Sequence, residues 1–530
     1  MDRSVMAIDL GRRTFRAAVS TTPRRVAALA LVSLLAASCS ATSGSGPSGP
    51  GGEPVTGGTL KVGVTSDISS LNPYDGAGES TSLVLAQLNA GLFKRFNDKV
   101  TPAIAEGLAP SADGKSVTIT LRKGLKFSDG KPITPQDVVF SLEQAKQGGV
   151  VGSLYKETIT AEKAQGADQV VLDLVRPTIN LDALLSYTQA AIIPDGFGGV
   201  GKDEFYRNPV GAGPFSFTGR RPGTSVSLTK NKNFWDGKKP YVDAIDFQVF
   251  NSVNALTSAF QAGTVQAVPF APRESVPSFA GANVVHTAAA STELVFVNGR
   301  TGPLKSLQVR QAISAAIDRK AIVKQLGSTA DKPTETYLPV TVLGQAHPAP
   351  VGDQDLAKAK QLLAGTPYSS GASIELIYPT GDATLAMTVQ AIQEDLANAG
   401  IKLNAKALDL GAWVQRLLAG NYELAYQSIS AAGSTAEAPL AFYVTSNAIG
   451  GGWSTQVAKD TLQQYQAAKD AAGQAQALDT FQNWIGSELP EIPTVSVSPA
   501  LVLSTKVGGF QGMPTVTQQS LPMEELWLAK

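Results

Sequence analysis

Short stretches in which apolar and polar residues alternate predict β-strands with one buried face. In residues 59–65 every second residue, beginning with Leu60, is apolar, and a turn is predicted at residues 71–73. Residues 117–121 repeat this alternation, beginning with Val117. Both stretches are therefore expected to form half-buried strands.

Apolar residues spaced three and four positions apart predict amphipathic helices. One such helix follows Thr134, an expected N-cap, with Pro135 at the first helical position and Asp137 in the first turn. A second helix is predicted across residues 309–321, where apolar side chains recur at helical spacing.

Residues 374–403 predict a βαβ unit. Residues 374–378 have the pattern of a buried strand, and the helix over 385–396 is expected to end at Gly400. Alternation resumes at residues 401–403, which predicts the next strand. Helices and strands mixed along the whole chain indicate an α/β fold.

The N-terminus has the pattern of an export signal that ends at a lipid-modified cysteine. Arg24 and Arg25 precede the apolar run 26–37, which is too short to span a membrane. Small residues then precede Cys39, the only cysteine, as in a lipobox in which the Cys sulfur takes a diacylglycerol. We expect residues 1–38 to be a signal peptide and 39–56, rich in Gly, Ser and Pro, to be the lipidated Cys and a flexible tether.

Two other interpretations of this N-terminus remain open. The first is a plain secretory signal in which Cys39 is incidental. The second concerns the export route, because residues 11–16 look like a twin-arginine motif, although they lie far upstream of the apolar run.

The charge of the chain gives no reason to expect a nucleic-acid partner. The chain has 44 Lys and Arg against 44 Asp and Glu, and removing residues 1–38, with six Arg and two Asp, leaves a net charge of −4. Nucleic-acid binding depends on cationic side chains that neutralise phosphates, so this class of partner is set aside.

Motifs for catalysis, metals or cofactors are missing from the sequence. The two histidines, His286 and His347, lie far apart without clustered carboxylates or Cys. Residues 114–116 imitate the end of a phosphate-binding loop but are better explained as a hairpin turn, and residues 211–213 lack the third Gly of a dinucleotide site. We therefore expect no enzyme activity, no cofactor and no metal, although sequence alone leaves a scattered carboxylate pair open.

Five stretches, in order along the chain, form a specific combination of motifs. The most diagnostic is LRKGLKFSDGKPITPQDVVFSLEQA, residues 121–145. The others are GGTLKVGVTSDISSLNP (57–73), NPVGAGPF (208–215), KNFWDGKKPYVDAI (232–245) and VRQAISAAIDRKAIV (309–323). Together they resemble family 5 of the extracellular solute-binding proteins, the dipeptide and oligopeptide binders of bacterial ABC importers.

This resemblance implies a two-lobed periplasmic-binding-protein fold of cluster C, with a hinge and an extra domain on lobe one. Lobe one would comprise residues 57–94, 206–290 and 490–530, the extra domain 95–205, and lobe two 291–489. The two segments that cross between the lobes, near 290 and 490, would form the hinge.

The function implied by the resemblance is capture of a solute between the lobes, followed by delivery to an ABC permease with its ATPase. We expect a monomer held at the extracytoplasmic face of the membrane by its lipid anchor. Two other functions stay open: a pseudo-receptor lipoprotein that regulates envelope biogenesis without transporting a ligand, and a cell-wall hydrolase.

The resemblance also suggests which residues contact the solute. In lobe one they are the residues after the turn at 71–73, namely Ala77, Gly78 and Glu79. In lobe two they are Ser428, Ser430, Ala432, Gly433, Glu437 and Trp453. An aromatic side chain at Trp453 could cover the solute, and the alternative for this residue is packing in the core.

One departure from the family pattern bears on the solute. Peptide-binding members hold the peptide's α-ammonium with an Asp just after the lobe-two strand, where this chain has Ala431, Ala432 and Gly433. A buried ammonium needs an acidic partner, and the nearest carboxylate to these residues is that of Glu437. We therefore expect di- and tripeptides with free N-termini to bind poorly, and neutral or N-blocked solutes to be preferred.

Overall fold

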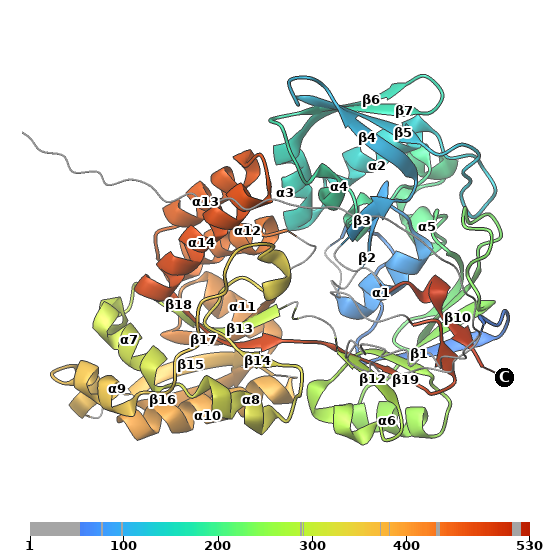
Figure 1. Ribbon diagram of the computed structural model, residues 1–530. Coiled ribbons are helices and arrows are strands. Elements are labelled where there is room, and N and C mark those ends of the chain that lie inside the picture. Colours follow the sequence, from blue (N-terminus) through green and yellow to red (C-terminus); the bar gives the residue numbers. More distant parts are fainter. Residues whose placement is uncertain are drawn as a thin grey trace, which may run out of the picture. The chain divides into compact units, whose positions relative to one another are not determined.

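The computed structural model describes residues 53–75, 78–96, 99–286, 289, 291–370, 373–380, 382–430, 435–510 and 521–529 (Figure 1). The predicted signal peptide 1–38, Cys39 and most of the predicted tether lie outside these residues. Ala77, Ala432 and Gly433 also lie outside them.

A seven-stranded mixed sheet combines segments that are far apart in the sequence. Its strand order is β12-β19-β11-β1-β10-β9-β8. The strands are β1 (Thr59–Val64), β8 (Phe215–Arg221), β9 (Ser225–Lys230), β10 (Ala244–Val249), β11 (Ala267–Ala271), β12 (Asn283–His286) and β19 (Ala500–Leu503). Strand β1 is parallel to β10 and β11, and its residues Leu60 and Val62 are fully buried, which confirms the predicted strand.

Short elements complete this part of the chain. The helices beside the sheet are α1 (Glu79–Leu88), α6 (Val253–Gln261) and the 3-10 turn η3 (Arg273–Ser278). A hairpin of β2 (Phe93–Phe96) and β3 (Lys99–Pro102) follows α1. The C-terminal elements are β20 (Val507–Gly508), η8 (Met523–Glu525) and β21 (Trp527–Leu528).

A four-stranded antiparallel sheet lies within residues 105–174. Its order is β4-β5-β7-β6, with β4 (Ala105–Pro110), β5 (Ser116–Leu121), β6 (Ile159–Gln165) and β7 (Gln169–Leu174). The turn at residues 114–116 joins β4 to β5, so the hairpin interpretation is confirmed. Its helices are α2 (Pro135–Ala145), α3 (Gly149–Thr158), α4 (Leu181–Leu184) and α5 (Lys202–Arg207).

Helix α2 begins as the sequence predicts. The Thr134 backbone N–H donates to Asp137 Oδ2 at 2.7 Å, and the Asp137 N–H donates to Thr134 Oγ1 at 3.4 Å. This reciprocal pair forms a capping box, which satisfies two backbone donors that would otherwise lack partners.

A six-stranded sheet has the order β14-β18-β13-β17-β15-β16. Its strands are β13 (Ser291–Val297), β14 (Lys332–Pro333), β15 (Ser373–Pro379), β16 (Lys402–Leu408), β17 (Leu424–Ser430) and β18 (Glu491–Val497). Alternate residues of β13 point into two different hydrophobic cores. Val295 and Val297 belong to the first core, and Leu294 and Phe296 belong to the second, so both faces of the sheet are covered.

Each face of this sheet has its own set of helices (Figure 1). The first core contains side chains of α7 (Leu307–Ala316), α8 (Arg319–Leu326), α9 (Leu356–Leu363) and α10 (Ala383–Ala399). The second contains side chains of α11 (Leu410–Leu418), α12 (Glu437–Ser446), α13 (Gln456–Ala467) and α14 (Ala471–Glu488).

The predicted βαβ unit is confirmed, whereas the prediction of a single helix over residues 309–321 is wrong. Strands β15 and β16 are parallel, and α10 between them ends at Gly400, whose φ is +95°. The other segment divides into α7 and α8 at residues 317–318. Asp318 causes the break, because its carboxylate accepts from the Ala321 N–H at 2.8 Å and begins a new helix.

The chain passes between the seven-stranded and six-stranded sheets twice. The first passage follows the end of β12 at His286 and precedes the start of β13 at Ser291. The second lies at residues 498–499, between β18 and β19, and not near 490 as the sequence suggested. The reason is that β18 pairs with β13 along its whole length before the chain leaves the six-stranded sheet.

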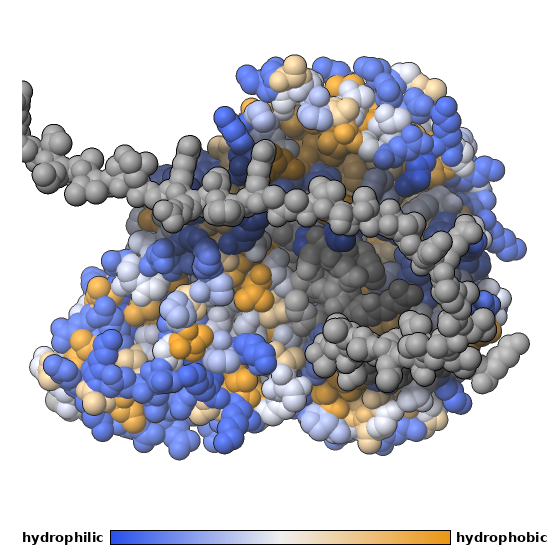
Figure 2. Space-filling view, viewed as in Figure 1, coloured by the Kyte–Doolittle hydropathy of each residue, from blue (hydrophilic) through white to orange (hydrophobic). Residues whose placement is uncertain are grey.

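The visible surface is mixed in character. Figure 2 shows hydrophilic residues over much of the described surface in this view, with hydrophobic residues in separate patches. Among the described residues, the exposed large apolar side chains are Val175, Ile179, Val200, Val340, Leu410, Val414, Leu418 and Phe442.

Candidate functional site

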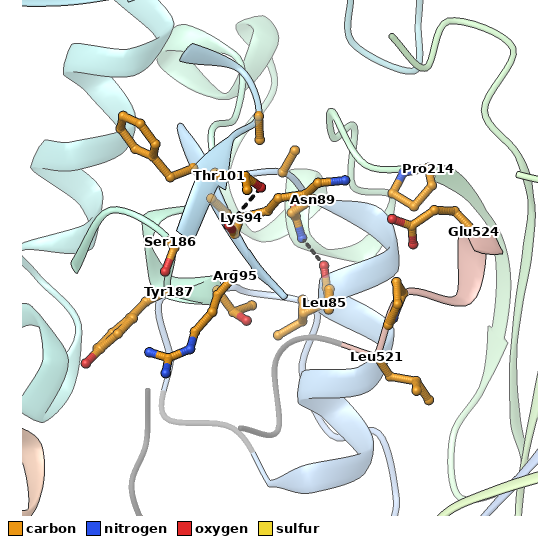
Figure 3. Close-up of a pocket in the computed structure, with 18 of the residues that line it drawn as sticks. Leu85, Asn89, Lys94, Arg95, Thr101, Ser186, Tyr187, Pro214, Leu521 and Glu524 are labelled. Atoms are coloured by element: carbon orange, nitrogen blue, oxygen red, sulfur yellow. Dashed lines mark hydrogen bonds between the residues drawn. The ribbon is translucent and has the colours of Figure 1, made fainter. Parts of the chain in front are cut away.

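A pocket of about 370 Å³ lies at the C-terminal half of α1 (Figure 3). Four segments enclose it: α1, the β2–β3 hairpin, residues 186–191 and residues 521–525. Pro214, Phe234 and Trp235 complete its lining. These segments are separated by up to several hundred residues, so only the fold brings them together.

The walls of the pocket are largely apolar. The apolar lining consists of Leu85, Ala86, Ala90, Phe93, Ala103, Ala191, Pro214, Phe234, Trp235, Leu521 and Pro522. Helix α1 supplies the first of these because its other faces are packed into the core, where Leu83, Val84 and Leu88 are at most 2% exposed. A concave apolar wall of this volume is typical of small-molecule sites.

Two cations lie near the ring of Trp235, which lines the pocket. Lys94 Nζ lies 5.2 Å from the centroid of its ring, and the Arg122 guanidinium carbon lies 5.4 Å from it. Both distances are within the range of a cation–π interaction. Arg122 is fixed in turn by its Nε, which donates to the Ala103 carbonyl at 2.6 Å.

The two acids of the pocket lie near cations of the same body. Glu524 is 9% exposed, and burial raises its pKa while nearby Lys94 opposes the rise. Glu525 Oε1 lies 2.5 Å from Lys239 Nζ, which also lies 3.3 Å from Asp236 Oδ2. These charges stabilise the C-terminal segment against the seven-stranded sheet.

Polar side chains lie at the other end, around residues 186–188. Ser186, Tyr187 and Thr188 line the pocket, and Figure 3 shows Arg95 and Tyr187 extending to the same side of it. The Tyr187 side chain is buried, and its hydroxyl shares a hydrogen bond of 3.1 Å with Thr435 Oγ1. Thr435 directly precedes α12, so the pocket adjoins the body of the six-stranded sheet at this point.

The predicted solute contacts in lobe one lie at the opposite end of α1. Gly78 is the N-cap of α1, Glu79 is its first residue, and both are exposed. The pocket begins one and a half turns further on, at Leu85. Neither Gly78 nor Glu79 lines the pocket.

The predicted contacts in lobe two are spread over three places. Ser428 and Ser430 lie in β17, opposite Glu293 and Ser291 of β13. Ser428 is half-buried and Ser430 is exposed. Neither residue lines the pocket.

Glu437 lies in the first turn of α12, beside the part of the chain with the four-stranded sheet. Burial raises its pKa, and hydrogen bonds from Thr435 and Gln466, together with the charge of Arg176, oppose the rise. Its carboxylate is therefore hydrogen-bonded by groups of its own side of the interface and lies within the field of a charge from the other side.

Trp453 is fixed by packing and hydrogen bonding against β13 and α7. Its Nε1 donates to the Val297 carbonyl at 2.6 Å, and the Arg310 guanidinium lies 4.4 Å from its ring centroid. A Cβ on Gly299 would come within 2.8 Å of the ring. Trp453 does not line the pocket, and these contacts agree with the core-packing alternative.

The pocket residues were missed because local sequence gives them only weak signals. The clearest was Phe234-Trp235 beside the basic residues of 232–245, a stretch noted only for its family resemblance. Residues 521–525 contain two acids near apolar residues, and nothing local indicates that they lie against α1.

Within the described part of the chain, no three His, Cys, Asp or Glu side chains are grouped so that they could hold a metal ion. His347 is exposed and contacts Asp479 Oδ2 through Nδ1 at 3.1 Å. The same residues contain no helix that is both long and apolar enough to cross a membrane.

Comparison with known families decides what kind of protein this is. The sequence model described as "Bacterial extracellular solute-binding proteins, family 5 Middle" matches residues 99–451, well over half of the 530 residues. The chain belongs to this family. The resemblance found in the sequence is thereby confirmed, and members of the family are transport proteins that act outside the cytoplasm.

Two curated relatives illustrate the range of this solute-binding family. The glutathione-binding protein GsiB of Salmonella choleraesuis (strain SC-B67) is 28% identical over 358 residues, which cover 66% of this chain and 69% of that protein. The oligopeptide-binding protein AppA of Bacillus subtilis is 28% identical over 445 residues, covering 76% and 80%.

Solved structures establish the fold. The substrate-binding protein CtaP of Listeria monocytogenes matches with a TM-score of 0.79 at 23% identity, covering 90% of this chain and 100% of its own. AppA of Bacillus subtilis in complex with a nonapeptide gives 0.75 at 21% identity with the same coverage. The fold is therefore that of the two-lobed periplasmic binding proteins of the oligopeptide-binding type.

Proposed function

We propose that this chain is the receptor of an ABC importer, that it captures a small peptide-like or neutral solute, and that it is not an enzyme. The observation that carries the proposal is the pocket of about 370 Å³, with apolar walls and a few polar groups, in a family 5 chain. The names of the relatives support it, since GsiB is a glutathione-binding and AppA an oligopeptide-binding protein.

In this proposal the two lobes close over the solute and the closed form is delivered to a permease with its ATPase. Lobe one comprises residues 57–94, 206–290 and the C-terminal part, the extra domain 95–205, and lobe two the segment from 291 to the passage at 498–499. A solute drives closure only if it binds the closed form more tightly than the open form.

We also propose that the protein is a monomer anchored by lipid on Cys39 at the extracytoplasmic face of the membrane. A tether of 17 residues, 40–56, has a typical span of roughly 20–25 Å, which leaves the folded body free to move above the membrane. Cys39→Ser is expected to release the protein into the soluble fraction. If the variant stays in the pellet after high salt and carbonate, an uncleaved N-terminal helix anchors it instead.

The proposed solute has no free α-ammonium. Residues 431–433 lack the acid that would pair with an ammonium, and the Glu437 carboxylate is hydrogen-bonded by Thr435 and Gln466. The two acids that line the pocket already have cations beside them, Lys94 for Glu524 and Lys239 for Glu525. Burying an ammonium without an acidic partner costs several kcal/mol. Isothermal titration with a library of di- and tripeptides should give no micromolar binding, and binding that disappears on N-acetylation would contradict this specificity.

Native mass spectrometry tests the transport function itself. Protein purified from its own host is compared with the same protein after denaturation and refolding. We expect the first sample to contain an additional noncovalent mass that the second sample lacks. The absence of any such mass from host-purified protein, together with unchanged Trp fluorescence on addition of cell extract, would favour the pseudo-receptor alternative.

A further inference from the structure

Two side chains of the extra domain meet three side chains of the six-stranded body in one hydrogen-bonded group, called here the clasp. It consists of Tyr187 and Arg176 on one side and Thr435, Glu437 and Gln466 on the other. Tyr187 and Thr435 are each 2% exposed, and their hydroxyl oxygens are 3.1 Å apart. A buried hydrogen bond therefore connects the wall of the pocket with the start of α12.

Glu437 lies at the centre of the clasp. The side chains of Thr435 and Gln466 hydrogen-bond to its carboxylate. Arg176 Nη2 donates to Gln466 Oε1, which makes a second contact between the two bodies. The Tyr187 and Thr435 hydroxyls share one hydrogen bond, in which either oxygen can be the donor.

A neighbouring pair extends the same interface. Asn180 Nδ2 donates to Gln474 Oε1 of α14 at 3.1 Å. Helices α3 and α12 also lie in contact here. The clasp is thus the polar part of a larger surface on which the extra domain meets α12, α13 and α14.

Tyr187 takes part in both the pocket and the clasp. The residue lines the pocket, and its hydroxyl reaches Thr435. A solute that contacts Tyr187 restricts the position of the hydroxyl. The hydrogen bond in turn keeps the ring in the pocket wall, so each event favours the other.

We propose that Tyr187 is a positioning residue that couples solute in the pocket to closure of the six-stranded body through the clasp. The inference rests on the proposed function. The clasp can nevertheless be measured without any solute, so a failure of the clasp proposal can be told from a failure of the proposed transport function.

The test compares Tyr187→Phe and Thr435→Val, which each remove one hydroxyl and keep the shape of the side chain. Tyr206→Phe is the matched control, since it makes the same change beside the same hydrophobic core at a residue that does not line the pocket. Spin labels at Ala164→Cys in β6 and Gln464→Cys in α13, both exposed, report the distance across the interface in full-length protein with Cys39→Ser.

Distances are measured by electron double resonance on host-purified protein and on refolded, solute-free protein. Loss of one hydrogen bond should raise the ratio of open to closed molecules roughly two- to tenfold in Tyr187→Phe and Thr435→Val. The double variant should add little to the effect of Thr435→Val, because that change already removes the Tyr187–Thr435 bond together with the Thr435–Glu437 bond. Thermal unfolding should fall only slightly below that of Tyr206→Phe, by the amount expected for one lost hydrogen bond.

The proposal is overturned if Tyr187→Phe and Tyr206→Phe give the same distance distributions in both samples. If Tyr187→Phe fails to fold, Thr435→Val tests the same hydrogen bond.

Time-resolved native mass spectrometry measures the coupling between solute and clasp. We expect the carried mass to leave Tyr187→Phe two- to tenfold faster than it leaves the wild type. An unchanged release rate contradicts the coupling. A changed distance in a protein that never contains a solute would overturn the transport function and leave the clasp intact.

Discussion

Two interfaces hold the six-stranded body against the rest of the protein, and they differ in chemistry. Beside the crossing segments, Arg273 of η3 is paired with Glu293 and Asp331, and both acids are 1% exposed. At the other interface, the clasp depends mainly on neutral hydrogen bonds and on one half-buried arginine. The first interface joins an arginine to two buried carboxylates, and the second is held mainly by hydrogen bonds between neutral side chains.

The acceptors around Arg273 show how completely the first interface is satisfied. Arg273 Nη1 lies 3.0 Å from Asp331 Oδ2, and its Nη2 also donates to Thr384 Oγ1 at 2.9 Å. Asp331 Oδ1 accepts the Ser498 N–H at 2.9 Å, at the second passage between the sheets. Separation here would leave buried charges unpaired, whereas separation at the clasp exposes polar groups to solvent. We infer that the crossing side is a fixed joint and the clasp side opens.

The largest expected effect comes from breaking the fixed joint. Arg273→Ala leaves Glu293 and Asp331 buried without their cation, and should lower the free energy of unfolding by about 3–5 kcal/mol. Chemical denaturation measures this loss. The control is Arg220→Ala, whose partner Asp67 lies 3.8 Å away in a more exposed pair, and which should cost about 0–1 kcal/mol. Equal losses in the two variants would contradict the distinction.

Glu293 and Glu491 are two buried acids of the six-stranded sheet, and their different surroundings predict a pH dependence of stability. Arg273 and Tyr426 oppose the rise in the pKa of Glu293 that burial causes. Burial raises the pKa of Glu491 to about 8, and its Oε1 accepts from Asn447 Nδ2 at 2.9 Å. Its Oε2 has no hydrogen-bond partner among the described residues.

The folded pKa of Glu491 is above its unfolded value, so the protonated acid stabilises the fold below about pH 4.3. This stability is lost as the pH rises towards 8, by about 1.4 kcal/mol per pH unit in between. The free energy of unfolding of the wild type minus that of Glu491→Gln should therefore fall from pH 5 to pH 8. A difference that stays constant over this range would show that Glu491 is ionised or solvated throughout.

A smaller effect is expected from the corresponding change at the clasp. Arg176→Ala removes the donor to Gln466, and should cost about 0.5–1.5 kcal/mol of unfolding free energy because water can replace the contact. The same substitution, Arg to Ala, thus separates the two interfaces in one denaturation series. A loss as large as that of Arg273→Ala would mean that the clasp is also a fixed joint.

The sequence predicts best those features that depend on neighbouring residues. The capping box of Thr134 and Asp137 and the end of α10 at Gly400 follow from local hydrogen bonding and backbone geometry. The break between α7 and α8 was missed because apolar spacing continues through it, although Asp318 three residues before Ala321 is a local N-cap signal.

The candidate site depends on contacts that no local pattern contains. Leu85 and Leu521 line one pocket although more than 400 positions separate them. The Tyr187–Thr435 contact spans 248 positions. Glu437 was predicted as a solute contact, which stays a prediction, and its position beside the extra domain follows from tertiary packing alone.

The central claim is that the pocket beside α1 holds the solute. Its most direct test is native mass spectrometry of wild-type protein and Ala86→Trp, both purified from the host, because an indole at this half-buried pocket residue fills the space that the solute would occupy. We predict an additional noncovalent mass on the wild type and none on Ala86→Trp, with equal thermal unfolding of the solute-free proteins. The same additional mass on both proteins would contradict the account.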